Sequence, residues 1–513
     1  MESKLFSAVR NIYSAFICRI VGLILPFILR AVMIYTIGAE YLGLTGLYQS
    51  IFAFLNIADL GLGSAIVYMM YKPMAEGDTD TICALLRVYR NIYRLIGGIV
   101  FISGLAIIPF LPHLIHGEMP QDIQPVVVYL ILLLDSCLGY FFFSYRESLF
   151  NASQRVDILN YIELWVKVLT SAVQIYLLLR YQNFYLYCIV IPVITLFRNF
   201  AVAYISHKKY PQYVCKGTIT SEQKQQLRKQ VSGLLIGKIS GNLGYNLDTI
   251  IISAFFGLAV LVKYQNYAMI SLQLSTLVGL MQLSVIPGLG NSLVTETKEK
   301  NYENLFTYQF MFMWLNGWIA ACLVCLYQPF MRFWMGEEML LADAVIPVFG
   351  FYYITDKLNN VCWQFRIASG LWWEERYRAI FSGIFNLVMD LILIHIWGAA
   401  GVMIATILYQ LFFDSIWGTR ILFSNRFSGK NKWEYLKVSY FYMMVIIICC
   451  VICYFVCSYL PMVQGRNMQA LGIMFLKVMI CTVLSNGLMW LIYRRTKEYR
   501  NSESIFKRII HWK

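Results

Sequence analysis

Two arginines, Arg19 and Arg30, lie within an otherwise apolar stretch near the N-terminus, with Pro26 between them. Spacings of seven and eleven residues return to nearly the same side of an α-helix, so the three residues share one face. The two guanidinium groups would lie roughly 16 Å apart along the helix axis. Because guanidinium stays charged and binds phosphate bidentately, we predict that this face binds a diphosphate at more than one depth. Alternatively, both arginines pair only with acids such as Asp59 on the next apolar stretch.

A predicted hinge in the same apolar stretch and two polar residues in a later stretch extend this hypothesis. Pro26 interrupts the hydrogen-bond ladder and Gly22 lies one turn earlier, so we expect a hinge there, although a passive packing kink would look the same. The apolar stretch near residue 240 carries Lys238 and Asn242 on one helical face. If both stretches line one cavity, that cavity offers cations at several depths.

The composition says which solvent must surround these helices. Hydrophobic residues make up 59% of the 513 residues and charged residues 14%, whereas a soluble domain has about a quarter charged residues. The mean hydropathy is +0.61. The net charge of +14 is concentrated in alternate loops, which is typical of membrane topology and argues against nucleic-acid binding. We therefore predict an all-α polytopic membrane protein.

Apolar runs of bilayer-spanning length divide the chain into about fourteen transmembrane helices. We predict an N-terminal lobe of six helices over 1–206, a basic cytoplasmic linker over 207–230, and a second six-helix lobe over 231–423. Residues 424–513 hold two further helices and a basic tail. The predicted spans are approximately 12–37, 44–70, 92–115, 124–147, 158–180, 184–206, 231–256, 263–290, 305–328, 344–366, 378–397, 399–421, 438–460 and 468–493.

The distribution of lysine and arginine in the short loops predicts the orientation. Most of them fall on one side, which includes the linker and the C-terminal tail, and basic loops stay in the cytoplasm. Both termini are therefore expected there, in a bacterial inner membrane. The N-terminal run is too long for a signal peptide and contains arginines, so we interpret it as a retained helix.

The two six-helix sets resemble a weak internal repeat. Arg19-Ile-Val-Gly22 in the first span corresponds to Lys238-Ile-Ser-Gly241 in the seventh, and each is followed by a glycine at the same offset. An even number of helices per half makes such a repeat parallel, related by a pseudo-two-fold axis along the membrane normal. Substrate is then expected to pass between the lobes, unless the similarity of these short strings is due to chance.

Several other charges within the predicted spans have structural explanations. Glu163 and Lys167 are four residues apart in the favoured order, which predicts an ion pair within one helix. Asp390 and Asp414 lie near the ends of their spans and are expected to be structural.

Most of the cysteines lie in apolar runs, where a thiol behaves as a small hydrophobic group. The densest group could place three sulfur atoms on one helical face, but no second Cys/His pair completes a metal site. We therefore expect packing, and neither a metal nor a cofactor. This group consists of Cys449, Cys450, Cys453 and Cys457.

The N-terminal region contains Tyr41-Leu-Gly-Leu-Thr-Gly-Leu-Tyr48, Leu55-Asn-Ile-Ala-Asp-Leu-Gly-Leu-Gly-Ser-Ala-Ile66 and Tyr71-Lys-Pro-Met-Ala-Glu76. These strings resemble the polysaccharide transporters of the multidrug/oligosaccharidyl-lipid/polysaccharide exporter superfamily, the O-antigen and capsule flippases. The resemblance is strongest over the first hundred or so residues, and beyond them it rests on the twelve-plus-two layout of spans.

The resemblance implies a transporter that flips an undecaprenyl-diphosphate-linked oligosaccharide to the outer leaflet by alternating access. Arg19 and Lys238 occupy positions similar to cationic cavity residues of that family, and Arg30 matches less well. A coupling ion, H⁺ or Na⁺, and a glycan polymerase of the same pathway are the expected partners besides the lipid-linked oligosaccharide and the bilayer. Asp59 and Asp248 are candidates to bind the coupling ion, which no motif identifies.

Three alternatives stay open at this point. A lipid II flippase or a cation-coupled multidrug antiporter of the same superfamily would share the fold, and an antiporter would favour an acidic cavity. A polytopic glycan polymerase or ligase fits less well, because the predicted outer loops are short and contain no nucleophile with a paired base. We therefore do not expect an enzyme.

Overall fold

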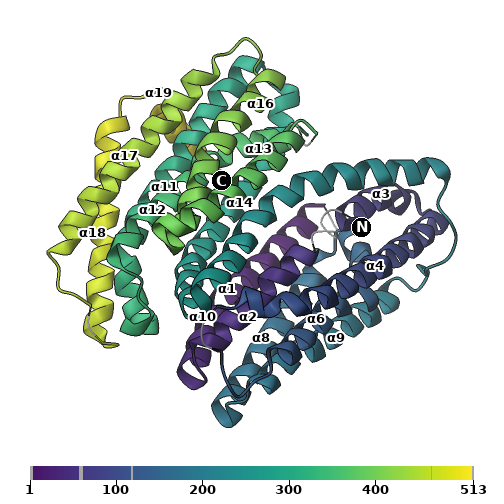
Figure 1. Cartoon of the computed structure of the whole chain (residues 1–513). Helices are drawn as coiled ribbons and strands as arrows, with labels where there is room; N and C mark the ends of the chain where they lie inside the picture. Colours follow the sequence, from purple (N-terminus) through teal and green to yellow (C-terminus); the bar gives the residue numbers. More distant parts are fainter. Residues whose placement is uncertain (1–3, 57–61, 117–118, 372, 464, 511–513) are drawn as a thin grey trace. The chain divides into compact units, whose positions relative to one another are not determined.

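The computed structural model describes residues 4–56, 62–116, 119–371, 373–463 and 465–510. These residues are helical almost throughout and form no strand (Figure 1). Contacts within the chain divide it into two units, Met1–Val262 and Lys263–Lys513. Within some helices the side chains lie outside the described part, namely those of 4–9, 12, 229–230, 232–245, 283–287, 505–506 and 508–510.

The first unit is a bundle of long helices connected by short turns. Its helix α8 packs against α1 and α9, while α6 packs against α4 and α9. Gly104 of α4 allows the close approach of α6, because a Cβ there would lie 2.4 Å from a methyl group of Leu133 and would displace it. The helices of this unit are α1 (Lys4–Thr36), α2 (Ala39–Leu55), α3 (Leu62–Glu76), α4 (Thr79–Ile107), α5 (Leu111–Leu114), α6 (Pro125–Phe141), α7 (Glu147–Ala152), α8 (Val156–Tyr181), α9 (Phe184–Lys209) and the first part of α10 (Ser221–Thr295).

Helix α10 is interrupted at Gly257. This residue has φ +79°, in the left-handed region that only glycine adopts at low cost. A Cβ at this position would also collide with the carbonyl oxygen of His116, which packs against the bend. Gly257 therefore separates two helical segments that coincide with the predicted spans 231–256 and 263–290.

The second unit is arranged around α11, which packs against α12, α13, α17, α18 and α19. It contains a cluster of buried aromatic and aliphatic side chains that includes Phe306, Phe365 and Tyr435. The helices of this unit are α11 (Lys298–Met335), α12 (Ile346–Leu358), α13 (Asn360–Ala368), α14 (Arg376–Trp397), α15 (Ala399–Tyr409), the π-helical segment η6 (Gln410–Trp417), α16 (Gly418–Asn425), α17 (Lys432–Ser458), α18 (Met468–Tyr493) and α19 (Lys497–Ile510).

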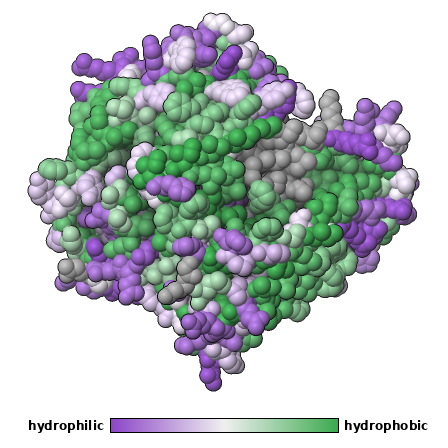
Figure 2. Space-filling view, in the orientation of Figure 1, coloured by the Kyte–Doolittle hydropathy of each residue, from purple (hydrophilic) through white to green (hydrophobic). Residues whose placement is uncertain are grey.

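The surface of these helices is largely hydrophobic. Figure 2 shows hydrophobic side chains over much of the visible face, with hydrophilic ones gathered mainly toward its margins. Large apolar side chains on single helices are strongly exposed, for example Trp165 of α8 at 71% and Phe197 of α9 at 68%. Exposed apolar surface of this extent is stable in lipid and not in water. The chain is therefore an all-helical, multi-span membrane protein.

The number of spans differs from the prediction. Among the described residues, ten helices are long and apolar enough to cross a membrane, or up to eleven if the bent pair Pro125–Phe141 and Ser144–Ala152 is one span. The count of about fourteen is thus not confirmed. The predicted span 344–366 falls on a broken helix, because it corresponds to α12 and α13. The predicted span 44–70 includes 57–61, which lie outside the described part of the chain.

Candidate functional site

A pocket of 320 Å³ in the first unit brings together several of the residues singled out in the sequence. Helix α1 contributes Gly22, Pro26 and Arg30, and α8 contributes Lys167. We call it the cationic pocket, since an arginine and a lysine both line it. Residues from α2 and α9, including Gln49 and Tyr187, complete the wall.

The contact between α1 and α8 explains why glycine occurs in this wall. A Cβ on Gly22 would lie 3.2 Å from Nζ of Lys167, which is closer than ordinary van der Waals contact. The absence of a side chain at Gly22 therefore leaves room for the ammonium group beside α1. Pro26 follows one turn later inside α1, where it removes one hydrogen-bond donor from the helix.

Lys167 is not paired with Glu163, and the predicted ion pair within α8 is wrong. Glu163 instead accepts a hydrogen bond from Nε of Arg198 on α9 at 3.0 Å. Nη1 of the same arginine binds Glu147 at 2.8 Å. A planar guanidinium can join two carboxylates in fixed geometry, which a flexible lysine does less well. As a result, Lys167 forms no ion pair with any described residue and carries its charge into the cationic pocket.

The other predicted site residues do not line the cationic pocket or lie outside the described part of the chain. Arg19 is exposed and does not line the cationic pocket. Lys238 and Asn242 lie on α10, but their side chains are outside the described part of the chain, and Asp59 is outside it altogether. Asp248 of α10 is described and is only 2% exposed.

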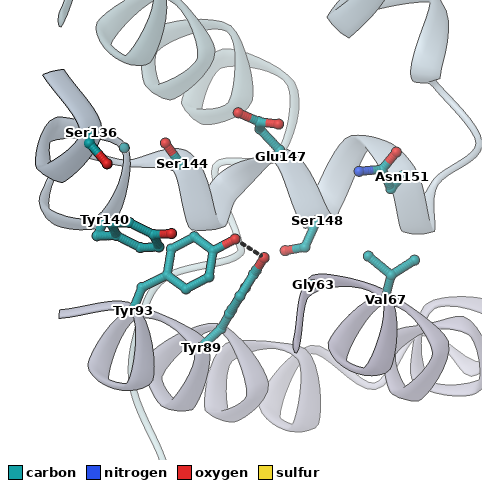
Figure 3. Close-up of a pocket in the computed structure, with 11 residues that line it drawn as sticks. Gly63, Val67, Tyr89, Tyr93, Ser136, Tyr140, Ser144, Glu147, Ser148 and Asn151 are labelled. Atoms are coloured by element: carbon teal, nitrogen blue, oxygen red, sulfur yellow. Dashed lines mark hydrogen bonds between the residues drawn. The ribbon is translucent and has the colours of Figure 1, made fainter. Parts of the chain in front are cut away.

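A second pocket of the same volume, 320 Å³, lies between α3, α4, α6 and α7 of the first unit. In Figure 3 the rings of Tyr89, Tyr93 and Tyr140 lie on one side, and Glu147 and Ser148 lie opposite them. We call it the tyrosine pocket. It was not predicted from the sequence, although Tyr89 and Tyr93 at a spacing of four residues are a visible signal.

The tyrosine pocket combines aromatic faces with hydroxyl groups. The hydroxyl of Tyr89 donates to that of Tyr93 at 2.7 Å, and their ring centroids are 4.3 Å apart. The hydroxyl of Tyr140 donates to Oδ1 of Asn56 at 2.9 Å. Gly63 of α3 is required here, because a Cβ would lie 2.7 Å from the Tyr89 hydroxyl. Such a surface suits a ligand with both apolar faces and many hydroxyl groups.

The second unit contains a buried ion network where α13, α14 and η6 meet. Arg378 donates to Glu375 at 2.7 Å and also to Asp414, while Arg366 forms an ion pair with Glu375. Burial alone would raise the pKa of Glu375, but Arg366 and Arg378 hold the pKa of that carboxyl below its ordinary value. The structural role expected for Asp414 agrees with this position in the network.

A separate polar cluster lies on α14 and α15. Asp390 is 0% exposed and accepts a hydrogen bond from the side-chain amide of Asn386 at 3.4 Å. The same amide also lies 3.3 Å from the hydroxyl of Thr406 on α15. A carboxylate, an amide and a hydroxyl are thus grouped within a membrane-spanning helix pair, where charged groups usually have a functional role.

A comparison with known protein families gives a match over the N-terminal part of the chain. The sequence model of a family described as "Polysaccharide biosynthesis protein" matches residues 8–293. No curated protein sequence gives a match.

Several solved structures share the fold. A lipid II flippase, MurJ, in an inward closed conformation has a TM-score of 0.63 at 15% sequence identity, covering 95% of this chain and 99% of its own. A multidrug resistance MATE family transporter of the MOP superfamily, in an inward-facing conformation, has a TM-score of 0.59 at 13% identity, covering 82% and 100%. A eukaryotic MATE transporter has a TM-score of 0.55 at 13% identity, covering 86% and 99%.

Proposed function

The chain belongs to the polysaccharide biosynthesis protein family, and from this we propose that it flips an undecaprenyl-diphosphate-linked oligosaccharide from the cytoplasmic to the outer leaflet. It has the fold of the MurJ and MATE transporters of the MOP superfamily. Neither the family nor this fold specifies the substrate. The choice of a lipid-linked sugar rests on the chemistry of the first unit.

The observation that carries the proposal is the ammonium of Lys167, which forms no ion pair with any residue in the described part of the chain and lines the cationic pocket together with Arg30. A lysine within a membrane span costs roughly 3 kcal/mol on insertion scales when nothing compensates its charge. A diphosphate would supply that compensation, since guanidinium binds phosphate bidentately and ammonium binds it as a point charge. Arg19, Lys238 and Asn242 are proposed to bind the same headgroup at other depths.

The tyrosine pocket is the proposed binding region for sugar residues of the same substrate. Its aromatic rings offer apolar faces, and its hydroxyl and carboxylate groups offer hydrogen bonds. We therefore propose that the diphosphate and the glycan bind to different parts of the first unit. Gly22 and Pro26 would form the hinge of α1 during alternating access.

A multidrug antiporter is the main alternative. Its cationic substrates would be repelled by Lys167 and Arg30, and no carboxylate lines the described wall of the cationic pocket. A lipid II flippase is a closer alternative, because lipid II also carries a diphosphate. The transported glycan distinguishes the two: loss of a lipid II flippase leads to lysis, whereas loss of the proposed protein removes only a surface polysaccharide.

An ion gradient would provide the energy if transport is coupled. Asp248, buried on α10, and Asp59 are the proposed sites for H⁺ or Na⁺. Asp390 is a further candidate, since its grouping with Asn386 and Thr406 offers the oxygen ligands that hard cations prefer. We further propose an inner-membrane location with both termini in the cytoplasm, and a functional link to the polymerase that uses the flipped substrate.

The direct test is a flipping assay in proteoliposomes with a fluorescent undecaprenyl-diphosphate oligosaccharide. We expect Arg30→Gln and Lys167→Gln each to slow flipping about 10- to 100-fold, because a charged hydrogen bond contributes about 1.5–3 kcal/mol. Arg180→Gln is the matched control, since Arg180 is an exposed residue in the last turn of α8. Wild-type rates in the double variant, with normal folding by size-exclusion chromatography, would refute the proposal. Faster flipping of lipid II than of the oligosaccharide lipid would instead favour the alternative flippase.

A further inference from the structure

Three helices of the second unit bring cysteine sulfur atoms together at one point. Cys325 of α11, Cys457 of α17 and Cys481 of α18 have sulfur atoms that all lie within 4.8 Å of one another. The sulfur atoms of Cys457 and Cys481 are 3.9 Å apart. All three residues are buried, with exposed fractions of 4%, 2% and 0%. We call this group the thiol cluster.

The thiol cluster is not the group that the sequence pattern suggested. That pattern places Cys449, Cys450, Cys453 and Cys457 along one helix, and only Cys457 belongs to the cluster. The other two members come from α11 and α18, which both pack against α17, and Cys325 of α11 lies far from Cys457 in sequence. The thiol cluster can therefore be recognised from the tertiary structure but not from the sequence.

The spacing of the sulfur atoms suits a three-coordinate metal ion. With metal–sulfur bonds of about 2.3 Å, sulfur atoms around a planar three-coordinate ion are about 4.0 Å apart. The distance between Cys457 and Cys481 already agrees with this value, and Cys325 needs only a small side-chain adjustment to reach it. A disulfide would instead require two sulfur atoms at about 2.05 Å.

The surroundings provide access and charge compensation. A cavity of 500 Å³ is lined by Cys325, Cys457 and Lys477, so the cluster borders open space and is not sealed by aliphatic side chains. Arg332 and Asp343 add charged groups to a wall that is otherwise mostly apolar. Lys477 is only 8% exposed, and its ammonium group can offset one negative charge of a metal–thiolate complex.

We propose that the thiol cluster binds one thiophilic metal ion, Cu(I), through Cys325, Cys457 and Cys481. Soft thiolate ligands select Cu(I) or Zn²⁺, and structural zinc almost always has four ligands. Among the described residues, no fourth ligand atom lies within 4.8 Å of all three sulfur atoms, although the thiols of Cys322 and Cys453 also interact with that of Cys481. Each thiol that binds releases its proton to solvent, so uptake depends on pH. The bound ion would crosslink α17 and α18 to α11.

The test uses the full-length purified chain under argon, titrated with Cu(I) held by a chromophoric chelator. We expect the wild type to remove one equivalent of Cu(I) and its thermal unfolding temperature to rise on binding. Cys481→Ser should weaken binding by at least about 100-fold, because even outer-shell changes cost about 10- to 100-fold. Cys188→Ser, a buried cysteine of α9 in the first unit, is the matched control and should behave as wild type.

A second variant and a spectroscopic measurement keep the test decisive if Cys481→Ser does not fold. Cys325→Ser removes a ligand from another helix and should give the same loss of binding. X-ray absorption at the copper edge should show three sulfur neighbours at about 2.3 Å in the wild type. Oxygen or nitrogen neighbours, or equal uptake by wild type and both variants, would overturn the proposal.

Discussion

Nε of Arg198 on α9 binds the carboxylate of Glu163 on α8 at 3.0 Å, across a helix pair and not along one helix. The same guanidinium also binds Glu147 at 2.8 Å. Arg198 therefore pairs with Glu163, the acid that the four-residue spacing predicts as the partner of Lys167. Because Glu163 pairs with Arg198, the positive charge of Lys167 in the cationic pocket is left for the proposed substrate to bind.

The first prediction follows from this pairing. Glu163→Gln should leave flipping near the wild-type rate, because the carboxylate compensates Arg198 and not Lys167. The variant should lose only a modest part of its thermal stability, since Arg198 keeps Glu147 as a partner. Parallel flipping rates and unfolding temperatures for Glu163→Gln and Lys167→Gln check this. Equal loss of flipping in both variants would contradict it.

Filling the cationic pocket should block transport without unfolding the protein. In Gly22→Leu the new side chain would occupy the space beside Lys167, where even a Cβ lies 3.2 Å from Nζ. We expect flipping to fall to background while expression and membrane insertion persist. Gly98→Leu is the control, because a Cβ on Gly98 meets no described heavy atom within 4 Å. A wild-type rate in Gly22→Leu would remove the pocket from the transport path.

Tyr93 provides a test of the tyrosine pocket as the glycan-binding region. Tyr93→Ala removes a ring whose centroid lies 4.3 Å from that of Tyr89 and 5.5 Å from that of Tyr140. We expect slower flipping of the oligosaccharide lipid by about tenfold, since an aromatic contact contributes about 0.5–1.5 kcal/mol beyond its buried area. Flipping of a lipid diphosphate with a single sugar should change less. Equal slowing of both substrates would argue for a purely structural role.

Glu375 should make stability depend on pH in the acidic range. Because the folded protein holds the pKa of this carboxyl below the ordinary value of 4.5, the unfolded chain binds a proton first as the pH falls. The stabilisation is therefore complete above the ordinary pKa and is lost as the pH falls through the lower, folded pKa. The difference in unfolding temperature between wild type and Glu375→Gln should be largest near neutral pH and shrink below about pH 4.5. A constant difference would exclude this contribution.

Gly257 should tolerate no side chain. Gly257→Ala combines a φ of +79° with a collision against the His116 carbonyl oxygen, and a strained backbone of this kind costs about 1–3 kcal/mol. We expect a lower unfolding temperature for the purified protein. Gly279→Ala, in an open position of the same helix, should be neutral or slightly stabilising. Similar values for the two variants would show that the bend adapts.

The features that could be predicted from sequence are those that depend on local composition and period. Apolar runs of bilayer length predicted the helical membrane fold, and the strings from Tyr41 to Glu76 pointed to a polysaccharide transporter, in agreement with the matching polysaccharide biosynthesis family. The shared face of Pro26 and Arg30 also agrees with their joint position in the cationic pocket. Whether Arg19 and Lys238 bind substrate stays a prediction.

Features that depend on contacts between helices could not be predicted. The choice of Arg198 over Lys167 as the partner of Glu163 requires knowing that α8 and α9 are neighbours. The same holds for the thiol cluster, whose members lie on three helices. The number of spans stays a prediction for a related reason, because hydropathy does not show whether a helix is broken, as it is between α12 and α13.

If the proposed function holds, the charge of Lys167 has an electrical consequence. Since the lysine stays with the protein, the phosphates that it would bind would carry net negative charge outward across a membrane whose interior is negative. The membrane voltage then favours each exported charge by about 2.3 kcal/mol per 100 mV. Export of such a headgroup would be electrogenic, and collapsing the voltage with an ionophore should slow it even where no ion gradient is used.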